Sequence, residues 1–143
     1  MTLVEMLIVL AIIGIASGGV ALAIGSATRA PSIESEARRF AIRLEAAGDD
    51  AMMGDRMVAL TVDKSGYGFA KVASDGVIPK GTPQLDYHSL PAGVAMTLDR
   101  APPLVLGIDG LSRPLTATLA NGDQRWTVRY DGLSATVSRT PAT

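Results

Sequence analysis

The sequence predicts an α+β protein in which a long N-terminal helix, apolar in its first half and amphipathic in its second, packs on an antiparallel β-sheet. Three observations support this prediction. Apart from Glu5, the N-terminal segment is uncharged and mostly apolar, the next segment repeats apolar residues at helical spacing, and the remainder alternates in period two between turn sequences. We therefore expect an apolar helix at 1–28, an amphipathic helix at 29–55 and a β-rich head at 56–143.

The first segment is a candidate membrane span. Residues Met6 to Thr28 form a run of 23 residues without a charge. A helix of that length extends for roughly 35 Å, against a hydrocarbon core of roughly 30 Å. No Lys or Arg precedes the run, although flanking charges normally orient a span. We therefore expect that a short basic leader has been removed and that Met1 begins the mature chain or a trimmed one.

Glu5 is the one charged residue at the start of this apolar helix. A carboxylate there costs on the order of a few kcal/mol unless it is paired or reaches the membrane interface. One interpretation is that Glu5 lies at the interface and interacts favourably with the helix N-terminus. The other pairs it with a cation, and the nearest positive group is then an α-amine, because the first 28 residues contain no basic side chain.

The opening run MTLVEMLIVLAIIG, residues 1–14, resembles the mature N-terminus of type IV pilins and type II secretion pseudopilins. The resemblance implies cleavage before Met1 by a prepilin peptidase and N-methylation of the new terminus. It also implies that Glu5 pairs with the α-amine of an adjacent subunit during filament assembly. The family usually begins with Phe, so Met1 is either a natural variant or a start codon that replaces the leader.

Four glycines interrupt the apolar helix, and each lowers helix stability by about 1 kcal/mol relative to Ala. They are Gly14, Gly18, Gly19 and Gly25. Small residues permit close packing of helices, and glycine also permits local bending or unwinding in a filament. The residues alone leave both roles open.

The second segment reads as an amphipathic helix. Ser32 is suited to cap its N-terminus, Glu34 and Glu36 fall in its first turn, and Gly54 lies near its end. Its apolar stripe comprises Ile33, Ala37, Phe40, Ala41, Leu44, Ala47 and Ala51. The charged residues are interpreted as a solvated face: Glu34, Arg38, Arg39, Arg43, Glu45, Asp49 and Asp50.

The head reads as a series of short strands. We predict them at 57–62, 67–72, 94–98, 104–108, 115–119, 125–130 and 134–137. The sequences Asn121-Gly122-Asp123 and Asp131-Gly132 are strong hairpin signals. Trp126 alternates with Val128 and Tyr130, which predicts that this face of the strand is core. A head of about 88 residues needs the amphipathic helix on its sheet to bury enough apolar area.

This layout is again similar to the pseudopilins, and the late segments Gly107–Gly110, Trp126–Val128 and Asp131–Leu133 are most similar to the H-type minor pseudopilin. The resemblance implies a structural subunit at or near the tip of a type II secretion pseudopilus, which supports protein export. It implies a single-pass inner-membrane protein with a periplasmic head. The implied partners are other pseudopilins, the inner-membrane assembly platform and the prepilin peptidase. The alternative is a minor pilin of a type IV pilus or DNA-uptake pseudopilus that acts as a binding or adhesion module.

Catalysis and cofactor binding are not expected. The chain has no cysteine and one histidine, His88, which excludes Cys-ligated and His-rich metal sites. Asp86 and Ser89 lie beside His88 in a predicted polar loop, but a catalytic triad is defined by geometry rather than by adjacency. The net charge of -1 gives no reason to expect a nucleic-acid partner. We thus expect no catalytic residue, no metal, no cofactor and no nucleic acid.

Overall fold

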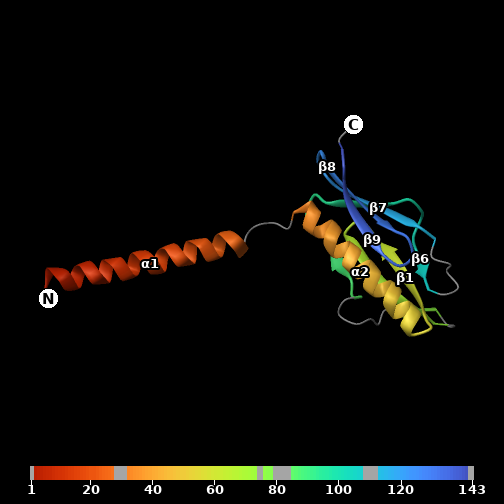
Figure 1. Ribbon diagram of the computed structural model, residues 1–143, viewed down its shortest axis with the longest axis horizontal. Helices are drawn as coiled ribbons and strands as arrows, with labels where there is room; N and C mark the ends of the chain where they lie inside the picture. Colours follow the sequence, from red (N-terminus) through yellow and green to blue (C-terminus); the bar gives the residue numbers. More distant parts are fainter. Residues whose placement is uncertain (1, 28–31, 74–75, 79–84, 108–112, 142–143) are drawn as a thin grey trace. The chain divides into compact units, whose positions relative to one another are not determined.

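A computed structural model describes residues 2–27, 32–73, 76–78, 85–107 and 113–141 (Figure 1). The contacts divide the chain into two compact units, Met1–Ala30 and Pro31–Thr143. The first unit contains helix α1 (Leu3–Ala27), and the second contains helix α2 (Ile33–Met53) and the strands of the head. The junction at 28–31, where the two halves of the predicted helix meet, lies outside the described residues.

Helix α2 begins and ends where its capping residues predict. The side chain of Ser32 accepts a hydrogen bond from the Ser35 N–H at 3.2 Å, which satisfies one of the free donors of the first turn. At the other end, the Gly54 N–H donates to the Asp50 carbonyl at 3.0 Å. The predicted start at Ser32 and end near Gly54 are therefore confirmed.

The α+β class is also confirmed, but the strands form two antiparallel sheets rather than the one expected. The first sheet contains β1 (Met57–Val62), β2 (Gly66–Ala73), β3 (Gly76–Ile78), β4 (His88–Ser89) and β6 (Leu104–Leu106), in the order β3-β2-β1-β6 with β4 on β2. The second contains β5 (Ala95–Leu98), β7 (Leu115–Asn121), β8 (Gln124–Tyr130) and β9 (Ala135–Thr140), in the order β5-β7-β8-β9. All seven predicted strands are present with small shifts of their ends, whereas β3 and β4 are too short for their patterns to predict them.

The register of each sheet sends one set of side chains inward. In the first sheet, Leu60 pairs with Phe69 across β1 and β2. In the second, Leu119 pairs with Trp126 and Ala117 pairs with Val128 across β7 and β8. Paired residues of antiparallel strands share a face, so each sheet presents a continuous apolar surface to the interior.

Helix α2 supplies the third layer of the head. It contacts β7, β8 and β9 of the second sheet and β1 and β6 of the first, and its ribbon crosses the strands in Figure 1. All seven residues of its predicted apolar stripe are buried. The helix thus closes a core to which both sheets contribute, as the small size of the head requires.

The predicted burial of the Trp126 face is confirmed, and none of the seven charged residues predicted to form the solvated face of the helix is buried. Val128 and Tyr130 are buried, and Trp126 is half-buried against the core. Glu36, which was not among those seven, is completely buried, although its place in the first turn suggested only a favourable interaction with the helix terminus. Glu36 stands between Ile33 and Phe40 at helical spacing, so it lies within the apolar stripe.

Candidate assembly site

Glu5 lies in the first turn of α1, where the sequence places it. Its backbone N–H donates to the carbonyl of Thr2 at 3.1 Å and approaches the Thr2 hydroxyl at 3.4 Å. The carboxylate is exposed and is the acidic group of that turn. A negative charge is favourable beside the free N–H groups of a helix N-terminus. Met1, the other predicted assembly residue, lies outside the described residues.

The helix around Glu5 is unusually apolar on its surface. The large hydrophobic side chains that it exposes are Leu3, Val4, Met6, Leu7, Ile8, Val9, Leu10, Ile12, Ile13 and Ile15. Their exposed fractions range from 47% to 81%, so this part of α1 leaves about half or more of each of these side chains uncovered. A contiguous apolar surface of this kind marks a contact with another protein or with lipid.

The predicted flexible glycines all fall within α1. Gly14 has open space around it, since a Cβ placed there would meet no atom within 4 Å. Gly18, Gly19 and Gly25 also lie within the helix bounds, and α1 runs through all four positions. Their proposed bending in a filament stays a prediction. Across the described part of the chain, no helix meets the length and hydropathy of a membrane span.

In the head, a cluster of charged groups joins α2 to the segment Leu85–Leu90. The His88 Nε2 lies 2.8 Å from one carboxylate oxygen of Glu36, and an Arg39 N–H donates to the other oxygen at 3.3 Å. The Arg43 guanidinium donates to the Asp86 carbonyl. A fully buried carboxylate is tolerated only when such partners compensate for its lost hydration.

This arrangement corrects the expectation of a polar loop at 86–89. His88 and Ser89 form the short strand β4, which pairs with the start of β2. His88 contacts Glu36 of α2, and neither Asp86 nor Ser89 is its hydrogen-bond partner among the described contacts. These neighbours in sequence therefore make no triad in the part of the chain that the structure describes.

Two tyrosines stabilise the same segment: Tyr67, whose ring centroid lies 5.4 Å from that of His88, and Tyr87, which is part of the segment. Tyr67 packs edge-on against Phe40 at 4.8 Å between ring centroids, and the Arg43 guanidinium lies 5.4 Å from its ring. Burial raises the pKa of Tyr67 to about 12. Its hydroxyl has no hydrogen-bond partner among the described residues, so the ring serves chiefly to fill the core.

The Tyr87 hydroxyl donates to the Asp63 carboxylate at 2.8 Å. The hydrogen bond from the Ser65 N–H, followed by the one from Tyr87, lowers the pKa of Asp63. The same contact with Asp63 raises the pKa of the Tyr87 hydroxyl. These bonds fasten the Asp63–Gly66 turn to the segment Leu85–Leu90.

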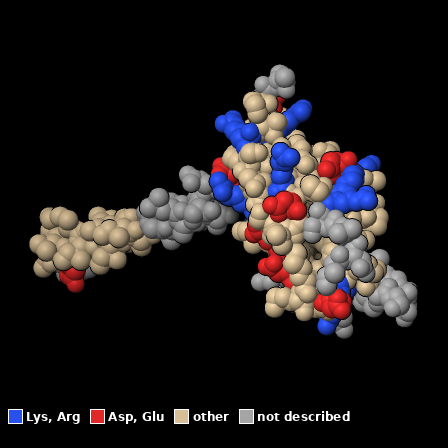
Figure 2. Space-filling model, turned by 45° about the vertical axis from the view of Figure 1, so that its right-hand side comes forward, with Lys and Arg blue, Asp and Glu red and all other residues tan. Residues whose placement is uncertain are grey.

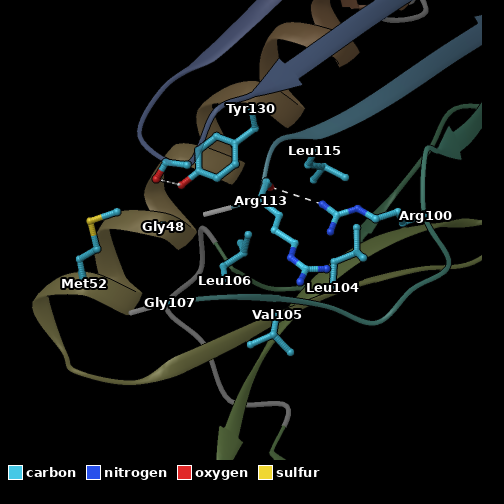
Figure 3. Close-up of a pocket in the computed structure, with 11 residues that line it drawn as sticks. Gly48, Met52, Arg100, Leu104, Val105, Leu106, Gly107, Arg113, Leu115 and Tyr130 are labelled. Atoms are coloured by element: carbon cyan, nitrogen blue, oxygen red, sulfur yellow. Dashed lines mark hydrogen bonds between the residues drawn. The ribbon is translucent and has the colours of Figure 1, made fainter. Parts of the chain in front are cut away.

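Figure 3 shows a cavity between α2, β6 and β8. It has a volume of about 50 Å³ and is lined mainly by apolar groups, among them Met52, Leu106 and Tyr130. The Arg100 guanidinium donates across it to the carbonyl of Pro114 at 2.9 Å. A space of this size holds a few waters rather than an organic ligand. Within the described residues, no group of His, Cys, Asp or Glu side chains is arranged to hold a metal ion.

A separate apolar helix followed by a helix packed on antiparallel sheets defines the pilin-like class of fold. No family model matches the chain, and no curated protein matches it. Solved structures, however, match the chain. A structure of the minor pseudopilin EpsH from the type 2 secretion system of Vibrio cholerae matches with a TM-score of 0.59 and 18% identity, over 74% of this chain and 94% of that one. A crystal structure of the same Vibrio cholerae protein matches with a TM-score of 0.58 and 16% identity, over 76% and 92%. The chain therefore has the pseudopilin fold, of the kind that the H-type minor subunits adopt.

Proposed function

We propose that the chain is a structural subunit of a type II secretion pseudopilus, a minor pseudopilin at or near the tip that supports protein export. The observation that carries this proposal is the position of Glu5, a lone exposed carboxylate at the start of a helix that leaves its large apolar side chains uncovered. The pseudopilin fold of the head supports it. Neighbouring subunits would cover the apolar surface of α1 and supply the positive group that Glu5 needs.

The pairing of Glu5 with the α-amine of an adjacent subunit explains why the charge is tolerated. Packing α1 against like helices would remove Glu5 from water, and an unpaired carboxylate there would be costly. An α-amine at the start of the neighbouring helix is a cation of the required sign. Before assembly, the uncharged run from Met6 to Thr28 would hold the subunit in the inner membrane, with the head in the periplasm.

The experiment is to replace Glu5 by Ala and by Gln in the full-length chain. Glu34→Ala is the matched control, since Glu34 pairs with Arg38 on the surface of the head. We expect both Glu5 variants to fractionate with membranes as the unaltered chain does, but to be missing from sheared filaments. The control should be recovered in filaments. Normal incorporation of both Glu5 variants would refute the pairing, and extraction of the unaltered chain by alkaline carbonate would refute the membrane anchor.

A binding role for the head is the second candidate, and the outer face of the second sheet favours it. Arg125 and Arg129 are exposed there, on strand positions that alternate with the core residues. Most of their neighbours on the same face are hydroxyl residues: Thr97, Thr116, Thr118, Thr127, Thr136, Ser138 and Thr140. On the side of the head seen in Figure 2, basic and acidic side chains are interspersed, which does not favour nucleic acid. Binding of DNA by the head (residues 30–143) without capture of other pseudopilins would support this second role.

A further inference from the structure

The segment Leu85–Leu90, here called the strap, connects the first sheet to helix α2. Its short strand β4 pairs with the start of β2. Ahead of this pair, the Phe69 N–H donates to the Leu85 carbonyl at 3.1 Å. Beyond it, the Leu90 N–H donates to the Ser65 carbonyl at 2.8 Å. The backbone of the strap therefore lies directly against that of β2.

Two glycines of β2 make room for the strap. A Cβ at Gly66 would overlap the His88 carbonyl oxygen. A Cβ at Gly68 would lie 3.3 Å from the Cα of Tyr87, a tight contact with another backbone atom of the strap. Neither glycine has a positive φ, so the contact rather than the backbone conformation requires a residue without a side chain. Both glycines share one face of β2, since alternate residues of a strand point to the same side.

The strap contributes little apolar surface to the core. Leu85 is its one buried residue, and Leu90 is half-buried against the core. The second sheet, by contrast, shares with α2 a core of completely buried apolar side chains, among them Leu115, Leu119 and Val128. Burial of apolar surface is the dominant favourable term in folding. The second sheet is therefore held more firmly than the strap.

Polar contacts fasten the strap to α2. The His88 Nε2 lies 2.8 Å from the Glu36 carboxylate, and the Arg43 guanidinium donates to the Asp86 carbonyl. The net contribution of such a bond to stability is small, because the same groups bond to water when the contact breaks. Release of the strap also returns the completely buried Glu36 to water, which offsets part of the loss. Opening of the strap thus costs less than unfolding of the core.

We propose that the strap is a conformational device, which opens from β2 and α2 as a unit while α2 and the second sheet keep their fold. In the closed state, His88 contacts Glu36 and lies against the Tyr67 ring, at 5.4 Å between centroids. Both Glu36 and Tyr67 are completely buried. Opening uncovers them and removes the links between the strap and the first half of α2. The inference is independent of the proposed function, because it concerns the head alone.

The first test measures hydrogen exchange of the full chain in detergent, with each rate corrected for the intrinsic rate of its amide. The Phe69 and Leu90 amides report on the strap, since their hydrogen bonds break when it leaves β2. The Val128 amide reports on the core, because β8 lies between β7 and β9. We expect Phe69 and Leu90 to be about 100-fold or more less protected than Val128. Equal protection at all three amides would overturn the proposal.

The second test uses Gly66→Ala, which places a Cβ beneath the strap and should hold it open. In this variant, the Phe69 and Leu90 amides should exchange at nearly the unprotected rate, whereas Val128 should stay protected by about 100-fold or more. Ser89→Ala is the matched control, since it alters an exposed side chain opposite Gly66, and it should behave as the unaltered chain does.

Two results with Gly66→Ala would overturn the proposal. Retained protection at Phe69 and Leu90 would show that the strap does not open. Loss of protection at Val128 together with these two amides would show that the strap is part of one cooperative unit with the second sheet. If Gly66→Ala cannot be purified, the exchange of the unaltered chain decides.

Discussion

Replacement of Gly48 by Ala should destabilise the head, although Ala is the better helix former. Gly48 lies in α2 directly against Tyr130, as Figure 3 shows. A Cβ at Gly48 would overlap the Tyr130 hydroxyl and lie 3.3 Å from the ring carbon that bears it. That hydroxyl is not free to move away, because Tyr130 is buried and donates to the Gly132 carbonyl at 2.8 Å.

Three contributions to the free energy of unfolding decide whether Gly48→Ala stabilises or destabilises the head. Exchanging Gly for Ala within a helix stabilises it by about 1 kcal/mol. Displacing the Tyr130 hydroxyl breaks its bond to Gly132 and leaves a buried polar group unsatisfied, which costs about 1–3 kcal/mol. The ring must also shift in a close-packed core, which adds about 1 kcal/mol. The net expectation for Gly48→Ala is a loss of about 1–3 kcal/mol in the free energy of unfolding.

The assay is a double-mutant cycle that combines Gly48→Ala with Tyr130→Phe in the head fragment (residues 31–143). The free energy of unfolding of each variant is measured by urea denaturation, monitored by circular dichroism. This fragment is a compact unit with its own core. Without the hydroxyl, the nearest ring carbon is a tight but adjustable contact, so Gly48→Ala should cost little or stabilise in that background. A coupling energy of about 2 kcal/mol is expected. Equal effects of Gly48→Ala in both backgrounds would refute the reasoning.

Three further predictions concern the charged and titrating groups of the head. Glu36→Ala should lower the free energy of unfolding by about 1–3 kcal/mol because it leaves the largely buried His88 ring without its hydrogen-bond partner, whereas Glu34→Ala, at the surface, should cost less than about 1 kcal/mol; comparable effects in urea denaturation would argue against this role of Glu36. Burial raises the pKa of Tyr67 to about 12, so the unfolded chain ionises first as the pH rises. Stability should fall by about 2–3 kcal/mol between about pH 10 and 12, and Tyr67→Phe should reduce that loss in denaturation measured at both pH values. Hydrogen bonds lower the pKa of Asp63 below its usual 3.8, so its contribution is present above that pH and is lost as the pH falls through the folded pKa; Asp63→Asn should make the acid unfolding transition less steep, and an unchanged transition would contradict this.

The local elements of this protein follow from its sequence. Ser32 and Gly54 delimit α2 because capping depends on residues within one turn. The hairpin at Asn121–Asp123 joins β7 to β8 for a similar reason, since its turn residues set the reversal of the chain. The lone charge of Glu5 in an apolar run is equally a local signal, and it remains the basis of the proposed assembly role.

The tertiary structure alone decided which of these elements meet. Alternation shows that a strand has an inner face but not which strand lies beside it, so the division into two sheets was not predictable. The contact of Glu36 with His88 joins residues 52 positions apart, and that of Glu45 with Ala135 joins residues 90 apart. The sequence carried one signal that Glu36 is buried, because Glu36 stands at helical spacing within the apolar stripe. No local pattern shows that α2 packs against β9 of the second sheet, because that depends on where α2 comes to lie when both sheets bury their apolar faces against it.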